Sequence, residues 1–94
     1  IRQFKVDIGL IGISGIESDG SLRDFDYREV LVTRTIMAHS RQIWLAADHS
    51  KFQRAAVVEL AYVRDIDMLF TGAAPSDDMA RLLTDSGVEC VVAP

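Results

Sequence analysis

Cysteine is almost missing from this sequence: Cys90 is the single one among 94 residues, so no internal disulfide bond can form. Because Cys90 lies in an apolar run, we expect it to be a buried strand residue in a protein of a reduced, cytoplasmic setting. Histidine is also scarce, and His39 and His49 are not spaced with cysteines or carboxylates as metal ligands are. We therefore expect no metal site and no cofactor.

Long apolar runs and an excess of positive charge are missing as well. No stretch approaches the roughly 20 apolar residues of a membrane-spanning helix, so we expect no membrane partner. The formal net charge is -4 and the pI is near 4.9. These values argue against this chain holding nucleic acid by itself, because binding to phosphates needs a basic face.

The sequence carries none of the common nucleotide-binding and hydrolytic motifs. There is no P-loop and no nucleophile elbow, and the early glycines do not form G-x-G-x-x-G, so a dinucleotide site has no support. The hydrophobic content of 49% with 26% charged residues is ordinary for a globular protein. The length permits one domain at most.

What the sequence does have is a short, isoleucine-rich apolar segment that ends in glycines, VDIGLIGISG over residues 6–15. It predicts a strand over 6–13 that is buried on both faces, as in a parallel sheet. Glycines such as Gly12 and Gly15 in a strand typically allow close approach of a ligand or of another backbone. Because ligands of open α/β sheets bind beyond the carboxyl ends of strands, this strand end is the first candidate for a site.

The rest of the chain alternates between strand and helix patterns. A loop over 14–24 is predicted, with a turn at Asp19-Gly20. A helix should begin at Asp24 or Asp26 and run to about residue 39, and a second should be capped by Ser76 and ended by Gly87. Further strands are predicted at 43–47, 52–60, 66–70 and 88–92, with one helical turn at 62–65. This order predicts an α/β fold with a mostly parallel sheet and helices on its faces.

One stripe of the first helix holds Phe25, Glu29, Val32 and Ile36, and its spacing predicts that it points inward. Glu29 would then be a buried carboxylate, which needs a partner. Two interpretations stay open: a salt bridge to a nearby arginine or lysine, or contact with a ligand. The helix is apolar around much of its girth, which favours further cover, such as a partner subunit.

Asp48 and Lys51 follow the second strand in the cluster Asp48-His49-Ser50-Lys51. Lys51 could meet a phosphate or a sugar hydroxyl as a point charge. The alternative is a solvated turn in which Asp48 bonds its own backbone, and from position alone we favour that turn.

Four spaced segments together resemble the sensor domain of the DeoR family of bacterial sugar-phosphate-responsive repressors. They are residues 7–16 (DIGLIGISGI), 27–30 (YREV), 48–52 (DHSKF) and 66–71 with Ile66-Asp67 before LFT. The resemblance covers essentially the whole chain. It implies a three-layer sheet with helices on both faces, related to ribose-5-phosphate isomerase and glucosamine-6-phosphate deaminase.

The resemblance also implies what this sequence does not contain. Members carry an N-terminal winged helix-turn-helix that binds operator DNA and an early Ser/Thr-Gly-rich loop that holds the effector's phosphate. Residues 1–94, which start at Ile1 rather than at a methionine, are then the C-terminal part of one sensor domain. The implied effector is a phosphorylated small metabolite, such as glycerol 3-phosphate or a sugar phosphate, and the implied assembly is a homo-oligomer.

Comparison with the related isomerases indicates which of their site residues this sequence keeps and which it lacks. By position, Glu29 and Lys51 match the isomerases' glutamate and lysine. The isomerases' aspartate-rich motif is replaced here by Gly12-Ile13-Ser14-Gly15-Ile16, with no carboxylate until Glu17. Acid–base isomerisation needs groups within reach of the substrate's carbonyl and hydroxyl. A site reduced in this way is expected to bind a sugar phosphate without converting it.

Three hypotheses follow. The first is an effector-binding module of a transcription repressor, with a ligand site built from Gly12, Gly15, Glu29, Asp48 and Lys51. The second is an isomerase-like enzyme, which the missing aspartates disfavour. The third is a purely structural dimerisation domain, which the apolar girth of the 25–39 helix would fit.

Overall fold

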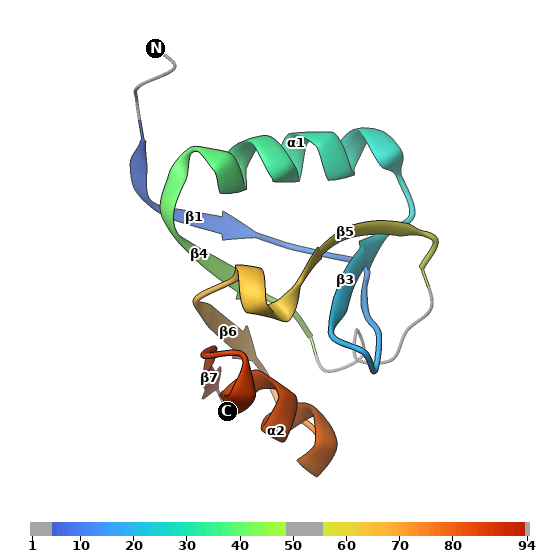
Figure 1. Cartoon of the computed structure of the whole chain (residues 1–94), viewed down its shortest axis with the longest axis vertical. Helices are drawn as coiled ribbons and strands as arrows, with labels where there is room; N and C mark the ends of the chain where they lie inside the picture. The colour runs from blue at the N-terminus through green and yellow to red at the C-terminus, as the bar shows by residue number, and fades with distance from the viewer. Residues whose placement is uncertain (1–4, 49–55, 94) are drawn as a thin grey trace.

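The computed structural model describes residues 5–48 and 56–93, and its helices and strands are shown in Figure 1. The order along the chain is β1 (Val6–Ile11), β2 (Gly15–Ile16), β3 (Ser21–Asp24), α1 (Tyr27–Ala38), β4 (Ser40–Ala46), β5 (Val58–Tyr62), the 3-10 turn η2 (Val63–Asp65), β6 (Met68–Thr71), α2 (Asp77–Asp85) and β7 (Glu89–Val92).

A parallel sheet forms the centre of the molecule. Its strand order is β1-β4-β6-β7, and each neighbouring pair is parallel. The strands β2, β3 and β5 form a second, antiparallel sheet. The predicted α/β fold with a mostly parallel sheet flanked by helices is confirmed.

Both helices begin and end where the sequence predicts. Asp26 caps α1, its carboxylate accepting a hydrogen bond from the Arg28 backbone at 2.8 Å. Ser76 caps α2 by accepting from the Met79 backbone at 3.2 Å. Gly87, with φ +78°, follows the end of α2, in a conformation that costs glycine little.

The prediction that residues 14–24 form a loop is wrong outside its turn, because β2 and β3 pair there as a short hairpin. The Asp19-Gly20 turn is real. The Asp19 carboxylate accepts bonds from the Ser21 backbone at 2.9 Å and from the Ser21 hydroxyl at 2.8 Å, and Gly20 has φ +89°. Only two apolar side chains of the hairpin, Ile16 and Leu22, are fully buried. Two residues are too few to give the alternation of apolar and polar residues by which a strand is predicted from sequence.

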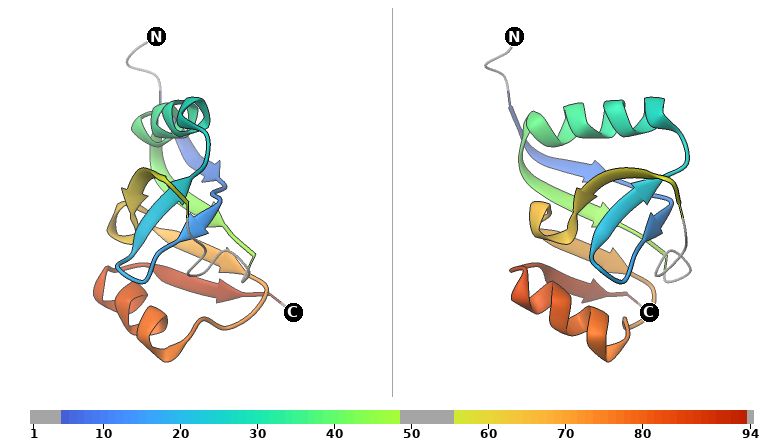
Figure 2. Two further views of the ribbon diagram at one scale, coloured as in Figure 1. Left: turned by 90° about the vertical axis from the view of Figure 1, so that its right-hand side faces the viewer. Right: turned by 45° about the vertical axis from the view of Figure 1, so that its right-hand side comes forward.

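The core lies on one face of the parallel sheet. Ile11, Leu45 and Leu69 point into it from three neighbouring strands and are almost fully buried. The antiparallel sheet, Val30 of α1 and Met79 and Leu83 of α2 cover them. Figure 2 shows α2, η2 and the antiparallel sheet on this same face, with α1 along the β1 end of it.

The other face of the sheet is open among the residues that the structure describes. On β1, the alternate residues Val6, Ile8 and Leu10 are 40%, 45% and 64% exposed. The prediction that this strand is buried on both faces is therefore wrong within the described chain. A three-layer fold remains consistent with this arrangement, since the open face is the place for the second outer layer.

The inward orientation predicted for the Phe25–Ile36 stripe is wrong. All four of its residues are exposed, and the helix instead buries Val30, three residues from Tyr27. The reason is the position of α1 at the edge strand β1. The helix contacts β5, β4 and β1, with Ile36 next to Gly9 of β1, but no described element covers the stripe enough to bury any of its four residues.

The segment from 52 to 65 was harder to predict, and residues 52–55 lie outside the described chain. The strand predicted there is present as β5, shifted toward Tyr62, and the predicted helical turn is η2. Neither α1 nor α2 has the length and apolar character needed to cross a membrane.

Candidate functional site

The carboxyl edge of the parallel sheet gathers several of the predicted residues. Gly12 directly follows β1 and Asp48 follows β4, and both are exposed. Thr71 ends β6 with a buried hydroxyl that finds no hydrogen-bond partner in the part of the chain that the structure describes. Because the strands are parallel, these ends share one edge, which is the usual ligand-binding edge of an α/β sheet.

The space around Gly12 is open. A Cβ atom added there would meet no atom within 4 Å. Gly15 lies differently: it is buried inside β2 and paired with Arg23 of β3. Of the two predicted glycines, Gly12 is the one whose backbone a ligand could approach directly.

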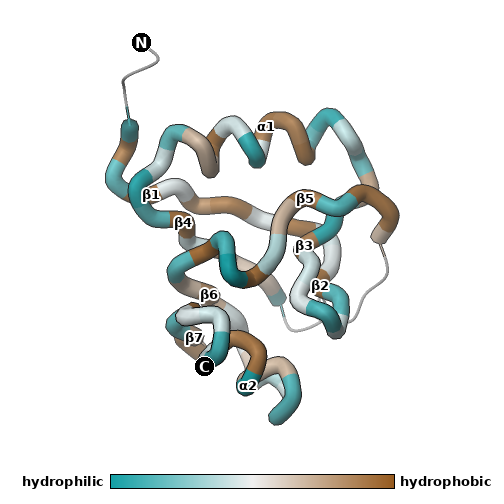
Figure 3. The backbone as a smooth tube through the Cα atoms, viewed as in Figure 1, coloured by the Kyte–Doolittle hydropathy of each residue, from teal (hydrophilic) through white to brown (hydrophobic). Residues whose placement is uncertain are grey.

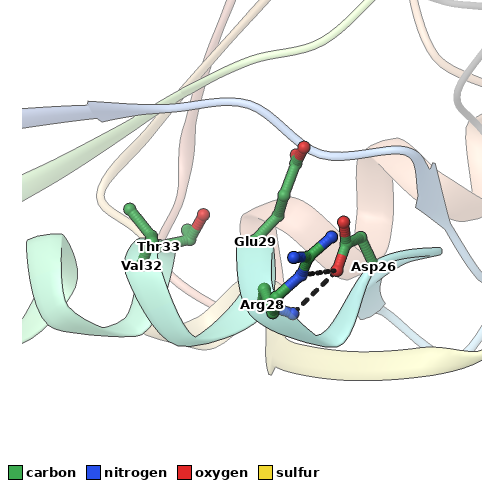
Figure 4. A pocket seen from close by; sticks show the side chains of 5 residues that line it. All are labelled: Asp26, Arg28, Glu29, Val32 and Thr33. Atoms are coloured by element: carbon green, nitrogen blue, oxygen red, sulfur yellow. Dashed lines mark hydrogen bonds and ion pairs between the residues drawn. The ribbon is translucent and has the colours of Figure 1, made fainter.

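Glu29 lies in the first turn of α1, and α1 begins beside the end of β1. Figure 4 shows its side chain extending from the helix toward the chain that leaves β1. It borders an open pocket of about 430 Å³ that is lined by Asp26, Arg28, Glu29, Val32 and Thr33. Glu29 is thus exposed rather than buried, and no ion pair joins it to another described residue. Of the two interpretations left open by the sequence, the described ion pairs lend no support to the salt bridge.

The charges around this pocket are mixed. Arg28 lies 3.7 Å from the Asp26 carboxylate, and its side chain is 89% exposed. Such a pair contributes little to stability, because water and salt screen it. Glu29 has no ion pair among the described residues, so both of its carboxylate oxygens can accept hydrogen bonds from a molecule in the pocket.

A buried carboxylate that the sequence did not single out for the site organises this corner. Asp24 accepts hydrogen bonds from the Ser14 hydroxyl at 2.8 Å and from the Phe25 backbone at 2.7 Å. It is 8% exposed. These bonds tie the chain after Gly12 to the chain that enters α1, and so they set where Glu29 lies relative to Gly12. The sequence signal that could have revealed this contact is the Asp19-Gly20 turn. If the two strands that flank the turn are paired, the pairing places Ser14 opposite Asp24.

Lys51 lies outside the described residues, as do His49, Ser50 and Gln53. The structure places Gly12 and Asp48 at the carboxyl edge of the sheet and Glu29 in the first turn of α1, and the shared site with Lys51 stays a prediction. Among the residues that are described, no group of three or more histidines, cysteines and carboxylates could hold a metal ion. Cys90 lies half-buried in β7, where burial raises the pKa of its thiol.

An α/β sheet with an open pocket beside the first helix is compatible with a small-molecule-binding domain, and comparison with known proteins gives the family. Residues 1–73 match the model of the DeoR C-terminal sensor domain, and the chain belongs to this family.

Known relatives are transcription regulators. The chain is 45% identical over 89 residues to the glycerol-3-phosphate regulon repressor of Escherichia coli K12, covering 95% of this chain and 35% of that protein. It is 55% identical over 75 residues to the protein of the same name in Haemophilus influenzae, covering 80% of this chain and 29% of that protein. A third relative, the HTH-type transcriptional repressor CsqR of Escherichia coli K12, is 38% identical over 92 residues, covering 98% of this chain and 35% of that protein. The chain thus spans about a third of the length of these relatives.

Proposed function

We propose that this chain is the effector-binding part of a cytoplasmic, homo-oligomeric transcription repressor, and that its ligand is a phosphorylated small metabolite, glycerol 3-phosphate or a sugar phosphate. The observation that carries the proposal is the open pocket beside Glu29 in the first two turns of α1, in a chain of the DeoR sensor family. The names of the relatives support glycerol 3-phosphate as the first ligand to test.

The charges at this edge indicate which part of the ligand it would hold. The lining of the described pocket carries the carboxylates of Asp26 and Glu29 and one cation, Arg28, and Asp48 follows β4 at the carboxyl edge of the sheet. Carboxylates accept hydrogen bonds from hydroxyl groups and repel phosphate. We therefore assign the hydroxyl end of the ligand to Glu29. The phosphate would be held by Lys51 and by residues beyond this chain.

Binding relieves repression only if the ligand has different affinities for the DNA-bound and free forms. Contact with operator DNA would come from a winged helix-turn-helix outside residues 1–94, because this acidic chain offers phosphates no basic face. An isomerase function is disfavoured, since the relatives are named as repressors and no aspartate-rich motif follows β1.

The test is a thermal shift of the natural protein that contains this chain, with glycerol 3-phosphate, a panel of sugar phosphates and inorganic phosphate alone. We expect one phosphorylated ligand to raise the Tm and to release a fluorescent operator duplex in an anisotropy titration. The variant Glu29→Gln should weaken binding of that ligand by about 10-fold or more, the equivalent of about 1.4 kcal/mol.

The matched control is Glu59→Gln, which removes an exposed carboxylate on β5 and should leave the affinity unchanged. Absence of any shift across the panel would contradict the ligand proposal. Turnover of a sugar phosphate that is lost in Glu29→Gln would replace it with the enzyme hypothesis.

A further inference from the structure

Buried polar side chains in the described part of the chain are hydrogen-bonded, with one exception. The buried polar residues are Ser21, Asp24, Ser40 and Thr71. Ser21, Asp24 and Ser40 each hold a side-chain hydrogen bond within the protein, at 2.8, 2.8 and 2.6 Å. The hydroxyl of Thr71, a residue that is 4% exposed, has no partner among the described residues. Because an unpaired buried hydroxyl destabilises a protein, Thr71 needs a separate explanation.

Thr71 occupies a position that suits an apolar side chain. Leu69 and Thr71 alternate along β6 onto the core face of the sheet, and both are buried. Ile11 of β1 and Leu45 of β4 belong to the same core, and Figure 3 shows apolar colour along β1. Valine has the branched shape of threonine and no polar atom. A hydroxyl in place of its methyl group adds no packing, so a hydrogen-bond partner outside the described residues accounts for it best.

The Thr71 hydroxyl lies at the edge of the sheet where ligands of α/β proteins bind. β6 ends at Thr71, and the next residue, Gly72, is exposed and would have no atom within 4 Å of an added Cβ. The Ala47 backbone donates to the Phe70 carbonyl at 3.0 Å, so the ends of β4 and β6 lie side by side. In the sequence, Lys51 follows shortly after β4. Thr71 is thus on the strand next to the one that leads to the predicted phosphate contact.

We propose that Thr71 is a specificity-determining residue of the effector site: its hydroxyl donates a hydrogen bond, directly or through one ordered water, to a phosphate oxygen of the ligand. This role rests on the proposed function, in which Glu29 accepts from the hydroxyl end of the ligand and Lys51 meets the phosphate. β6 is the second strand from β1, which places the two strand ends about 10 Å apart. A ligand that lies along this edge with its hydroxyl end beside β1 has its phosphate toward β6.

A hydroxyl that bonds only the ligand has opposite effects on stability and on affinity. Its bond to a charged phosphate is stronger than a bond between neutral groups, so it favours the complex. In the free protein the same hydroxyl is unpaired and lowers the stability. A hydroxyl with a structural role, bonded within the protein, would instead stabilise the free form. The two roles therefore predict opposite results when the hydroxyl alone is removed.

The test uses two variants of the natural protein that divide the threonine side chain. Thr71→Val keeps the shape and removes the hydroxyl, and Thr71→Ser keeps the hydroxyl and removes the buried methyl group. We expect Thr71→Val to hold or raise the Tm of the free protein and to weaken binding of glycerol 3-phosphate, or of the sugar phosphate that binds, by about 10-fold or more. Thr71→Ser should lower the Tm and change the affinity by less than about 3-fold. Thr84→Val, at an exposed threonine of α2, is the control and should change neither.

Inorganic phosphate, measured as a competitor of the bound ligand, tests which end of the ligand Thr71 meets. It should lose affinity in Thr71→Val by a factor similar to that of the whole ligand. A loss confined to the whole ligand would place the hydroxyl at the other end and overturn the phosphate assignment.

Three results would overturn the role of Thr71. One is a Tm of free Thr71→Val that falls by more than about 5 °C, or a variant that does not fold, because the hydroxyl would then be structural. The second is an unchanged affinity in Thr71→Val. If Glu29→Gln still weakens binding in that case, the proposed function stands without this residue. The third is an unmodified protein that binds no phosphorylated ligand of the panel, which contradicts the proposed function as well.

Discussion

Two glycines on either side of the end of β1 have opposite surroundings. A methyl group on Gly9 would overlap the Ser40 hydroxyl oxygen, lie 2.9 Å from Ser40 Cβ and lie 3.1 Å from Ile36 Cγ2. The Ser40 hydroxyl is also fixed, because it donates to the Ile36 carbonyl. Gly12 has no atom within 4 Å of the same position.

Gly9→Ala should therefore destabilise the fold by about 1–3 kcal/mol, the usual cost of overpacking. Gly12→Ala is the control for stability and should change the free energy of unfolding by less than about 0.5 kcal/mol. Urea denaturation of both variants measures this. Equal stabilities would contradict the close approach of β1 to α1 and β4.

Asp19 gives the β2–β3 turn a dependence on pH. Hydrogen bonds from the Ser21 backbone and hydroxyl lower the pKa of Asp19 below its ordinary value of 3.8. Because the folded pKa is the lower one, the stabilisation is fully present above pH 3.8 and is lost as the pH falls from there through the folded pKa.

We expect Asp19→Asn to be less stable than the unmodified protein at pH 7 and at pH 5, by the same amount at both. The difference should shrink as the pH falls below 3.8. Urea denaturation across this range measures it, and a difference that grows toward acid pH would show that the assigned sign is wrong.

At the scale of elements, α1 is held on the molecule from the side of β5. The Arg34 guanidinium donates to the carbonyl oxygens of Leu60 and Glu59, each at 3.0 Å. The cap at Asp26 determines where α1 begins, and the two Arg34 bonds determine which side of the helix lies against β5.

Replacing Arg34 by Met keeps the aliphatic stem and removes both bonds, and should cost about 1–2 kcal/mol of stability. Arg28→Met on the same helix is the matched control, because Arg28 makes only a screened surface pair and its loss should cost less than about 0.5 kcal/mol. Chemical denaturation compares the two. Equal losses would show that the contact of α1 with β5 does not depend on Arg34.

The elements that could be predicted from the sequence are those with a strong local signal. Caps at Asp26 and Ser76 and the stop at Gly87 fixed the helix boundaries, and continuous apolar runs fixed the parallel strands. The β2–β3 hairpin was missed because two buried residues, Ile16 and Leu22, carry it.

The buried side of α1 was predicted wrongly for a physical reason. Which side of α1 is buried depends on the position of β1 at the edge of the sheet and on the bonds of Arg34 to β5. The spacing of apolar residues along the helix contains no information about either. The same cause explains Glu29, which the spacing predicted to be buried and which is exposed beside a pocket.

At the scale of the whole molecule, the residues that could be predicted for the site are those at the ends of parallel strands. Gly12 and Asp48 lie at the carboxyl edge because the strand order places them there, and that order follows from the alternation of strands and helices. Asp24 was missed as an organising residue, since its bond to Ser14 spans ten positions across an unpredicted hairpin.

The acidic character of the described edge leads to one account of the molecule. We propose that this chain holds the hydroxyl end of a phosphorylated ligand and that the rest of the protein contributes to holding the phosphate.

The measurement that tests this account most directly is hydrogen exchange by mass spectrometry on the natural protein, with and without saturating glycerol 3-phosphate or whichever ligand the thermal shift identifies. We predict that bound ligand slows exchange in peptides covering residues 10–16 and 24–33, around Gly12 and Glu29. Saturation with ligand that leaves both peptides unchanged and protects only regions outside residues 1–94 would contradict it.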